Sequence, residues 1–298
     1  MTRTLVTGGA GRLGRSVVAA LAESGREVVS LDRVVAPGLA ARQVEIDLLD
    51  EGARAAAFDE VQPHEVVHLA AIPAPFQAPE HETYAVNTGL AFGVLDDALR
   101  LGVRSLLVAS SPTVLGYGAP DGWQAERLPL DERHPVAPWN GYALSKVAVE
   151  ELVRMTARRD GARLRTAAFR PCYVIAPEEW AGAPTQQGHT VLERLERPEL
   201  SAVALFNYVD ARDAGDFVVA WLDRAPEVPN GSVFFVGAPD ALVRGSVPDA
   251  VRAHLPQLAA AASGLGDTES LFSTARAREL LDWTARRTWR TELPKGPQ

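Results

Sequence analysis

A glycine-rich loop close to the amino terminus restricts the fold of this chain more than any other feature. Residues 7–14 read T-G-G-A-G-R-L-G, directly after the β-branched run 4–7 and directly before a helical pattern at 14–24. Because Gly8, Gly11 and Gly14 lack a β-carbon, the chain can turn sharply, pack the helix tightly on the strand and bring its backbone close to a ligand. The free N–H groups at such a helix start favour phosphate groups. The loop therefore predicts a strand–helix unit that binds a dinucleotide.

The alternation of strand and helix patterns continues over the first two thirds of the chain. Apolar runs at 27–31, 65–69, 105–109 and 164–170 alternate with helical patterns at 87–101 and 142–159. This alternation predicts an α/β fold of the Rossmann type, a doubly wound parallel sheet. From about residue 174 prolines break the pattern, with one further helix expected at 213–223. We expect a dinucleotide-binding domain at 1–173 and a small irregular α/β substrate-binding lobe at 174–298, from which some segments, such as 205–223, return to the first domain.

An acidic residue at the end of the second strand favours NAD as the dinucleotide. Asp32 follows Gly14 by 18 residues, where a carboxylate can hydrogen-bond the adenosine ribose hydroxyls. A carboxylate there repels a 2′-phosphate, which disfavours NADP. Arg12 and Arg33 could nevertheless receive that phosphate, so NADP stays open.

Tyr142 and Lys146 form a second group of interest, because residues four apart lie on one face of a helix. A free tyrosine has a pKa of about 10, too high for a base at neutral pH. A lysine cation nearby lowers that pKa by favouring the phenolate. Ser110 and Ser111 follow the strand at 105–109, at the sheet edge where doubly wound folds bind ligands, and could donate hydrogen bonds to a substrate oxygen.

Together these motifs resemble the extended form of the short-chain dehydrogenase/reductase superfamily, the NAD-dependent epimerase/dehydratase family. The resemblance covers most of the chain and includes I-D-L at 46–48, H-L-A-A at 68–71, R-P at 170–171 and the tail at 273–283. It implies that Tyr142 is the general acid/base, that Lys146 holds the ribose and depresses the Tyr142 pKa, and that Ser111 polarises the substrate oxygen with help from Thr113. The implied chemistry is hydride transfer between the nicotinamide and a substrate carbon.

The resemblance also implies a full set of binding residues. Asp47 and Leu48 would border the adenine, Ala70 and Ala71 would line the cofactor, and Asn87 would support its site. The expected cofactor-binding residues are Gly8, Gly11, Arg12, Leu13, Gly14, Asp32, Arg33, Asp47, Leu48, Leu69, Ala70, Ala71, Asn87, Tyr142 and Lys146. The expected substrate-binding residues are Ser111, Thr113 and Tyr173.

Two departures from the family pattern bear on the substrate. Nucleotide-sugar enzymes of the superfamily usually have an asparagine where this chain has Tyr173, and an arginine for the substrate diphosphate where it has Phe206. Arg212 and Arg244 could substitute for that arginine. The departures weaken the case for a nucleotide sugar, and the compact lobe resembles that of dehydrogenases acting on free sugars or sugar acids.

Three functions are weighed on this basis. The leading hypothesis is an NAD(P)-dependent oxidoreductase acting on a hydroxyl or carbonyl of a small, polar, sugar-like substrate. The alternative is a nucleotide-sugar epimerase with tightly bound NAD, with a dehydratase ranked below it because Pro112-Thr113 offers no carboxylate. The third is a non-catalytic nucleotide-sensing protein, which the intact Ser111, Tyr142 and Lys146 argue against.

Composition sets the remaining expectations. The net charge of −8 argues against a nucleic-acid partner, and apolar runs of strand length predict no membrane association and a cytoplasmic protein. His64-Glu-Val-Val-His68 matches the H-E-x-x-H zinc signature, but along an expected strand its histidines lie roughly 13 Å apart, so we predict no metal. A homodimer is expected from relatives through helices 87–101 and 142–159, where Val147, Val149 and Val153 either contribute or face the core.

Overall fold

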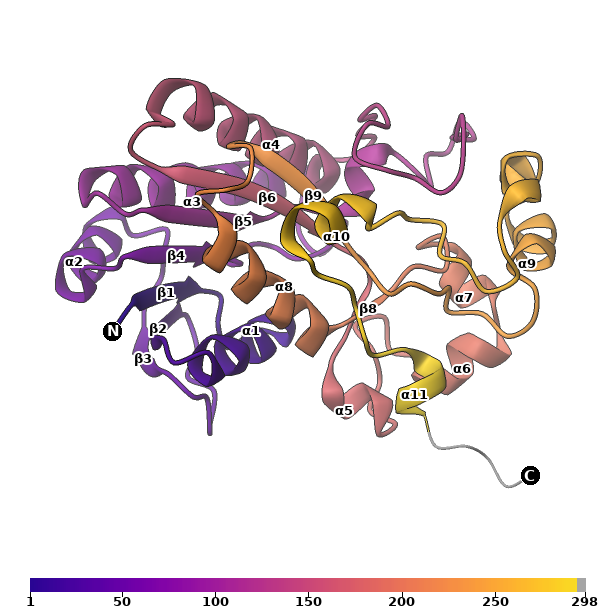
Figure 1. Cartoon of the computed structure of the whole chain (residues 1–298), viewed down its shortest axis with the longest axis horizontal. Coiled ribbons are helices and arrows are strands. Elements are labelled where there is room, and N and C mark those ends of the chain that lie inside the picture. Colours follow the sequence, from indigo (N-terminus) through magenta and orange to yellow (C-terminus); the bar gives the residue numbers. More distant parts are fainter. Residues whose placement is uncertain (294–298) are drawn as a thin grey trace.

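A seven-stranded sheet forms the centre of the computed structural model, which describes residues 1–293 (Figure 1). All neighbouring strands are parallel, in the order β3-β2-β1-β4-β5-β6-β9. The order reverses between β1 and β4, and ligands of doubly wound sheets bind at the carboxyl ends of the strands beside such a point. The strands are β1 (Arg3–Thr7), β2 (Glu27–Asp32), β3 (Arg42–Glu45), β4 (Glu65–His68), β5 (Ser105–Ala109), β6 (Arg165–Pro171) and β9 (Ser232–Val236).

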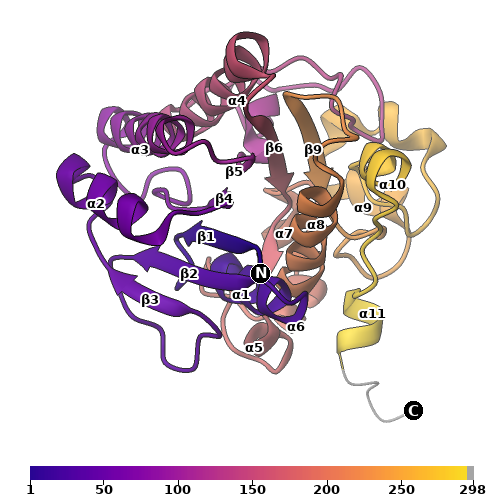
Figure 2. The ribbon, with the colours of Figure 1, turned by 60° about the vertical axis from the view of Figure 1, so that its left-hand side comes forward.

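Two groups of helices cover the two faces of this sheet (Figure 2). One face packs against α1 (Arg12–Glu23) and α8 (Ala211–Arg224), and the other against α2 (Glu51–Val61), α3 (Glu80–Arg100) and α4 (Gly141–Asp160). Because both faces are covered, strands such as β4 and β5 are buried along their whole length. This explains why they read as continuous apolar runs rather than as alternating patterns.

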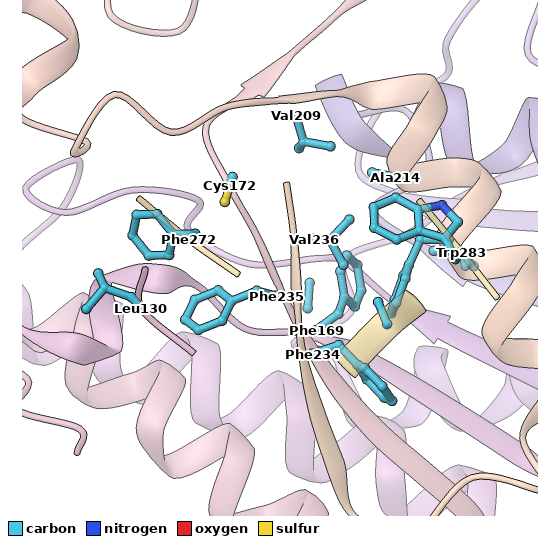
Figure 3. Close-up of a cluster of buried hydrophobic side chains, with 14 of the residues drawn as sticks. Leu130, Phe169, Cys172, Val209, Ala214, Phe234, Phe235, Val236, Phe272 and Trp283 are labelled. Atoms are coloured by element: carbon cyan, nitrogen blue, oxygen red, sulfur yellow. The ribbon is translucent and has the colours of Figure 1, made fainter. Parts of the chain in front are cut away.

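Aromatic side chains join the carboxyl-terminal part of the chain to the sheet (Figure 3). Phe217 of α8 packs against Trp283, with ring centroids 5.4 Å apart, and against Phe234 of β9 at 5.7 Å. On the other side of β9, Phe235 packs against Phe272 at 5.2 Å. These contacts cover both sides of β9, which pairs with β6 at the edge of the central sheet although it lies far beyond the other strands in sequence.

Several of the remaining elements form a lobe that extends beyond the carboxyl edge of the sheet (Figure 1). Its small sheet pairs β7 (Val174–Ile175) with β8 (Val209–Asp210), beside a separate apolar cluster that includes Ile175, Trp180 and Tyr208. The other short elements of the chain are α5 (Pro177–Trp180), α6 (Val191–Glu196), α7 (Glu199–Ala202), α9 (Val247–His254), α10 (Ala275–Leu281), α11 (Trp289–Glu292) and the 3₁₀ turns η1 (Pro112–Leu115), η2 (Pro256–Leu258) and η3 (Ala261–Gly264).

The predicted Rossmann-type sheet is confirmed, but some of its elements differ from the prediction. Helix α3 begins at Glu80, seven residues before the predicted start. The strands β3 and β9 and the helix α2 were not predicted, β9 because it follows a proline-rich segment. The division of the chain at residue 173 stays a prediction. No helix within residues 1–293 is long and apolar enough to span a bilayer.

Candidate active site

The glycine loop between β1 and α1 is shaped partly by the fold itself. Gly8 has a φ of +77°, and a β-carbon there would lie 2.7 Å from the backbone nitrogen of Ala70. A β-carbon at Gly14 would lie 2.2 Å from the carbonyl oxygen of Gly8. The left-handed turn and the close approach of α1 to the loop therefore require glycine at these two positions.

Gly11 differs, because the packing of the protein leaves room for a side chain there. Its φ is −71°, and a β-carbon would meet only the Gly8 carbonyl oxygen, at 3.3 Å. Gly11 is also the N-cap of α1, which has no side-chain cap and no acidic residue in its first turn. By contrast, α4 and α8 are capped by the side chains of Asn140 and Asp210. The space in front of Gly11 and the uncapped N–H groups fit a pyrophosphate.

Asp32 lies beside this loop, as predicted. Its Oδ2 accepts a hydrogen bond from the backbone N–H of Ala10 at 3.0 Å, and its Oδ1 accepts one from the N–H of Arg33 at 2.7 Å. The Arg33 side chain is exposed and makes no ion pair within residues 1–293. Arg12, in contrast, pairs with the buried Glu179 of α5, and burial lowers the pKa of its guanidinium. Of the two arginines that could receive a 2′-phosphate, only Arg33 is uncommitted.

The loop after β4 carries the next predicted cofactor residues, Leu69, Ala70 and Ala71, all half-buried. Asn87 of α3 fixes its course, since its Oδ1 accepts from the N–H of Ile72 at 2.8 Å and its Nδ2 donates to the carbonyl of Ile72 at 3.2 Å. Nδ2 also donates to Ser145 Oγ of α4 at 3.1 Å. Asn87 therefore ties the predicted cofactor loop to the helix that carries Tyr142.

Asp47 and Leu48, predicted to border the adenine, follow β3. Asp47 is exposed and accepts a hydrogen bond from the N–H of Leu49 at 3.0 Å. Leu48 is buried in the core, and its carbonyl accepts from Arg54 Nη1 at 2.9 Å. Leu13, in the first turn of α1, is partly buried against the core.

The three predicted catalytic residues lie together past the carboxyl end of β5. Ser111 caps η1, and its Oγ accepts hydrogen bonds from Thr113 Oγ1 at 2.9 Å and from the Thr113 N–H at 3.3 Å. Lys146 Nζ donates to the carbonyl of Ala109 at 2.9 Å and lies 5.7 Å from the centroid of the Tyr142 ring. The Ser111 hydroxyl also lies within hydrogen-bonding reach of the Tyr142 phenol.

The titration of this group differs from the expectation that Lys146 depresses the Tyr142 pKa. Burial raises the pKa of Tyr142 to about 12, although its proximity to Ser111 opposes the rise. Burial also lowers the pKa of Lys146 to about 8. The expected lowering at Tyr142 is absent because the phenol is desolvated and the ammonium is directed at the Ala109 carbonyl. The phenol is therefore fully protonated at neutral pH in this state.

A buried ion pair behind the catalytic residues was not predicted from sequence. Arg170 and Glu150 are almost completely buried, and Arg170 Nε and Nη2 donate to the two oxygens of Glu150 at 2.7 and 2.8 Å. Ser110 Oγ donates to Glu150 Oε1 at 2.7 Å. The prediction that Ser110 donates to a substrate was therefore wrong, since its hydroxyl is taken up by this carboxylate. The signal that could have found the pair is the R-P motif together with a glutamate one helical turn after Lys146.

The arginines predicted to replace a diphosphate-binding arginine are engaged elsewhere. Phe206 is completely buried and packs against His254, with ring centroids 6.4 Å apart. Arg212 pairs with Asp210 and Glu292, which raises its pKa. Arg244 is exposed and stacks on Trp289 at 5.7 Å. Sequence reasoning missed a different residue, Arg194, which stacks on Tyr173 and is described further below.

The H-E-x-x-H match lies on a strand, as predicted. His64, next to the start of β4, accepts a hydrogen bond from the N–H of Arg3 at one end of β1, whereas His68 bonds to Thr7 Oγ1 at the other end. Burial and the charges of Lys146 and Arg54 lower the His68 pKa to about 3. Within residues 1–293 no three histidine, cysteine or acidic side chains form a group that could hold a metal ion.

The fold and this arrangement define an enzyme of the extended short-chain dehydrogenase/reductase class. A family comparison agrees, since residues 4–237 match the NAD-dependent epimerase/dehydratase family, and the chain belongs to it. It is similar to a short-chain dehydrogenase/reductase superfamily protein from Agrobacterium tumefaciens crystallised with bound NAD, at 27% identity and a TM-score of 0.71, over 98% of this chain and 94% of that one. The chain is therefore a member of a family of NAD-dependent enzymes.

Named relatives include both epimerases and a dehydrogenase. UDP-glucose 4-epimerase from Mus musculus is 32% identical over 183 residues, which is 54% of this chain and 51% of the relative. L-arabinose 1-dehydrogenase (NAD(P)(+)) from Haloferax volcanii is 36% identical over 168 residues, 54% and 63% of the two proteins. The chain spans about half the length of the curated epimerases it matches. The relatives therefore support a sugar epimerase or a related oxidoreductase without deciding between them.

Proposed function

We propose that this enzyme is an NAD-dependent oxidoreductase that acts on a hydroxyl or carbonyl carbon of a small, polar, sugar-like substrate. The observation that supports it most is the convergence of Ser111, Tyr142 and Lys146 beside the glycine loop. NAD, when bound, supplies the nicotinamide that exchanges a hydride with the substrate carbon. The uncapped start of α1 would hold its pyrophosphate, and Asp32 its ribose.

The proton chemistry follows from the side chains of this chain. Ser111, whose Oγ accepts from Thr113, hydrogen-bonds the substrate oxygen beside Tyr142, which orients the reacting group. Tyr142, protonated at neutral pH, donates its phenol proton to a carbonyl oxygen that becomes an alcohol. In the opposite direction Tyr142 must lose its own proton before it accepts that of the alcohol, and its pKa of about 12 disfavours this step without added positive charge.

A nucleotide-sugar epimerase with permanently bound NAD is the second candidate. It is favoured by the family and by the UDP-glucose 4-epimerases among the relatives. The burial of Phe206 and the ion pairs of Arg212 count against a diphosphate-binding arginine at these positions. The intact catalytic group argues against a protein that only senses nucleotides.

One experiment separates these activities. The purified enzyme is incubated with NAD or NADP and with free sugars, sugar acids, sugar phosphates and nucleotide sugars, and both reduced nicotinamide and product mass spectra are recorded. Net reduction of NAD with a free sugar or sugar acid is the expected result. An isomerised nucleotide sugar without net reduction would establish the epimerase instead.

We also propose a homodimer through the outer face of α3 and α4. Val149 and Val153 are buried in the core and Val147 is partly buried against it, so they do not supply the contact. Tyr84, Phe92 and Leu144 are instead exposed on this face, beside a groove of about 380 Å³ lined also by Leu152 and Met155.

The dimer is tested by light scattering coupled to size-exclusion chromatography. The wild type is expected at twice the mass of the chain. Phe92→Glu is expected to shift it to the monomer with unchanged circular dichroism, because a carboxylate resists transfer from water into an apolar contact. A wild-type monomer at all concentrations would contradict the proposal.

A further inference from the structure

Arg194 is a buried cation whose surroundings differ from those of the other buried arginines. Arg54 and Arg170 each pair with a buried carboxylate, Asp97 and Glu150, at 2.8 and 2.7 Å. Arg194 is only 1% exposed, yet it makes no ion pair within residues 1–293. Burying an unpaired charge is costly, so an arginine held in this way is expected to serve an anion that enters from outside.

The groups around Arg194 are neutral acceptors from its own lobe. Its Nε donates to Thr185 Oγ1 at 3.2 Å, its Nη1 to the Leu200 carbonyl at 2.7 Å, and its Nη2 to Gln187 Oε1 and to the Tyr173 hydroxyl, the latter at 3.0 Å. The guanidinium also stacks on the Tyr173 ring, 4.4 Å from the centroid. These contacts fix the position of the guanidinium, but none of them neutralises its charge.

Tyr173 joins this cation to the carboxyl end of β6. It leaves the sheet two residues beyond β6, next to β5, whose extension carries Ser111. The phenol is half-buried, accepts from Arg194 and donates no hydrogen bond within residues 1–293. Since a guanidinium bound to its oxygen polarises the O–H, Tyr173 is a strengthened donor.

Asn207 adds a second donor without a partner. The residues before it, Leu205 and Phe206, have left-handed φ values of 52° and 55°, a strained conformation for large apolar residues. The turn lets Asn207 Oδ1 accept from the Tyr173 N–H at 2.8 Å. Its Nδ2 is buried and makes no hydrogen bond within residues 1–293. The Asn207 side chain lies beside the buried Tyr117 hydroxyl.

We propose that Tyr173, Asn207 and Arg194 form a subsite for an anionic oxygen of the substrate, a carboxylate or a phosphate. The proposal rests on the proposed oxidoreductase function and narrows its substrate to a sugar acid or a phosphorylated sugar. Tyr173 and Asn207 donate hydrogen bonds to the anion, and Arg194 is a positioning residue that acts through Tyr173 and supplies the charge. A neutral sugar would leave these buried donors and the cation without a partner.

The test measures binding rather than turnover, so that it does not depend on the proposed reaction. The Tyr142→Phe enzyme, saturated with NAD, is titrated calorimetrically with D-galactose, D-galacturonate, D-galactose 6-phosphate and UDP-galactose, and with the corresponding gluco series. The titrations are repeated with Tyr173→Phe and Arg194→Gln added. Arg252→Gln is the matched control, because Arg252 is exposed on α9 of the same lobe.

An anionic sugar is expected to bind at least tenfold more tightly than its neutral counterpart, an advantage lost with Tyr173→Phe and Arg194→Gln but kept with Arg252→Gln. Preference for the uronate indicates a carboxylate, for the 6-phosphate a phosphate, and for the UDP-sugar a diphosphate. If Arg194→Gln does not fold, Tyr173→Phe alone decides, because it removes one oxygen and keeps the stacked ring. Equal binding of neutral and anionic sugars, no binding of any anionic sugar, or a preference that survives Tyr173→Phe overturns the proposal. Anion-selective binding without turnover of any sugar by the wild type would instead refute the oxidoreductase and leave the subsite intact.

Discussion

The glycine loop lies at the carboxyl end of β1 and the catalytic edge at that of β5, with β4 between them, and the two are built from different interactions. The loop around Gly8, Gly11 and Gly14 is shaped by backbone geometry and the absence of side chains. The catalytic edge around Tyr142 and Lys146 is built from buried polar and charged groups, with the Arg170–Glu150 pair behind it. Substitutions in the loop are therefore expected to destabilise the protein through steric clashes. Substitutions of the buried charged groups at the edge are expected to do so electrostatically and by more free energy.

The two regions therefore differ in what folding them costs in free energy. The glycine loop costs little folding free energy when no ligand is bound, because glycine adopts the left-handed backbone conformation of such a turn without steric strain. Buried Lys146 and Tyr142 are held in unfavourable protonation environments, as their shifted pKa values indicate.

Tyr142→Phe is expected to have the largest effect, on catalysis alone. Removing the phenol removes the proton donor, which should lower kcat by about 10³-fold. NAD affinity and the free energy of unfolding should stay nearly unchanged, because the ring remains. Steady-state kinetics and NAD titration check this, and turnover at the wild-type rate would show that another group moves the proton.

Glu150→Gln is expected to reduce stability by about 3–5 kcal/mol, because it leaves Arg170 buried without a counter-charge. Glu151→Gln is the matched control, since the neighbouring glutamate is exposed and pairs only with Arg154. It should cost about 0.5 kcal/mol or less. Urea unfolding of both variants measures the difference. Equal stabilities of the two would mean that the Arg170–Glu150 pair does not stabilise the catalytic edge.

The positions of the loop, of Asp32 and of the Tyr142–Lys146 pair could be predicted because each depends on local spacing. Gly14 is required by contacts within one strand–helix unit, Gly8 has a left-handed φ, and Tyr142 and Lys146 share a single helix. Asn87 was also found, although its hydrogen bonds to Ile72 and Ser145 depend on the tertiary fold. Asn87 was predicted from the resemblance to the family, because no local spacing indicates these contacts.

Sequence reasoning failed where function depends on pairing across the chain. Ser110 was taken as a substrate donor because nothing local shows that Glu150, 40 residues away, accepts its hydroxyl. Arg194 and Tyr173 are 21 residues apart and meet only through the fold of the lobe. The early start of α3 was missed because Pro79, as its N-cap, offers none of the usual capping side chains.

Lys146 links stability to pH at the catalytic edge. Its pKa of about 8 lies below its ordinary value of 10.5, so the unfolded chain binds more protons between these values. The free energy of unfolding should therefore rise from pH 8 to 10.5, by at most about 3 kcal/mol from this group. Denaturation of the wild type and of Lys146→Met across this window isolates that contribution. Parallel pH profiles would mean that Lys146 is not destabilised by burial.

Gly14→Ala and Gly11→Ala sharpen the steric side of the comparison. A methyl group at position 14 would press on the Gly8 carbonyl, which should cost about 1–3 kcal/mol of stability. At position 11 the methyl fits the backbone conformation and should cost about 0.5 kcal/mol or less. The methyl group at position 11 would nevertheless occupy the space in front of α1, and the one at position 14 would displace the loop. NAD affinity should therefore fall tenfold or more in both variants. Thermal unfolding and NAD titration on the same samples separate the two effects. Unchanged NAD affinity in Gly11→Ala would mean that the pyrophosphate does not approach the uncapped start of α1.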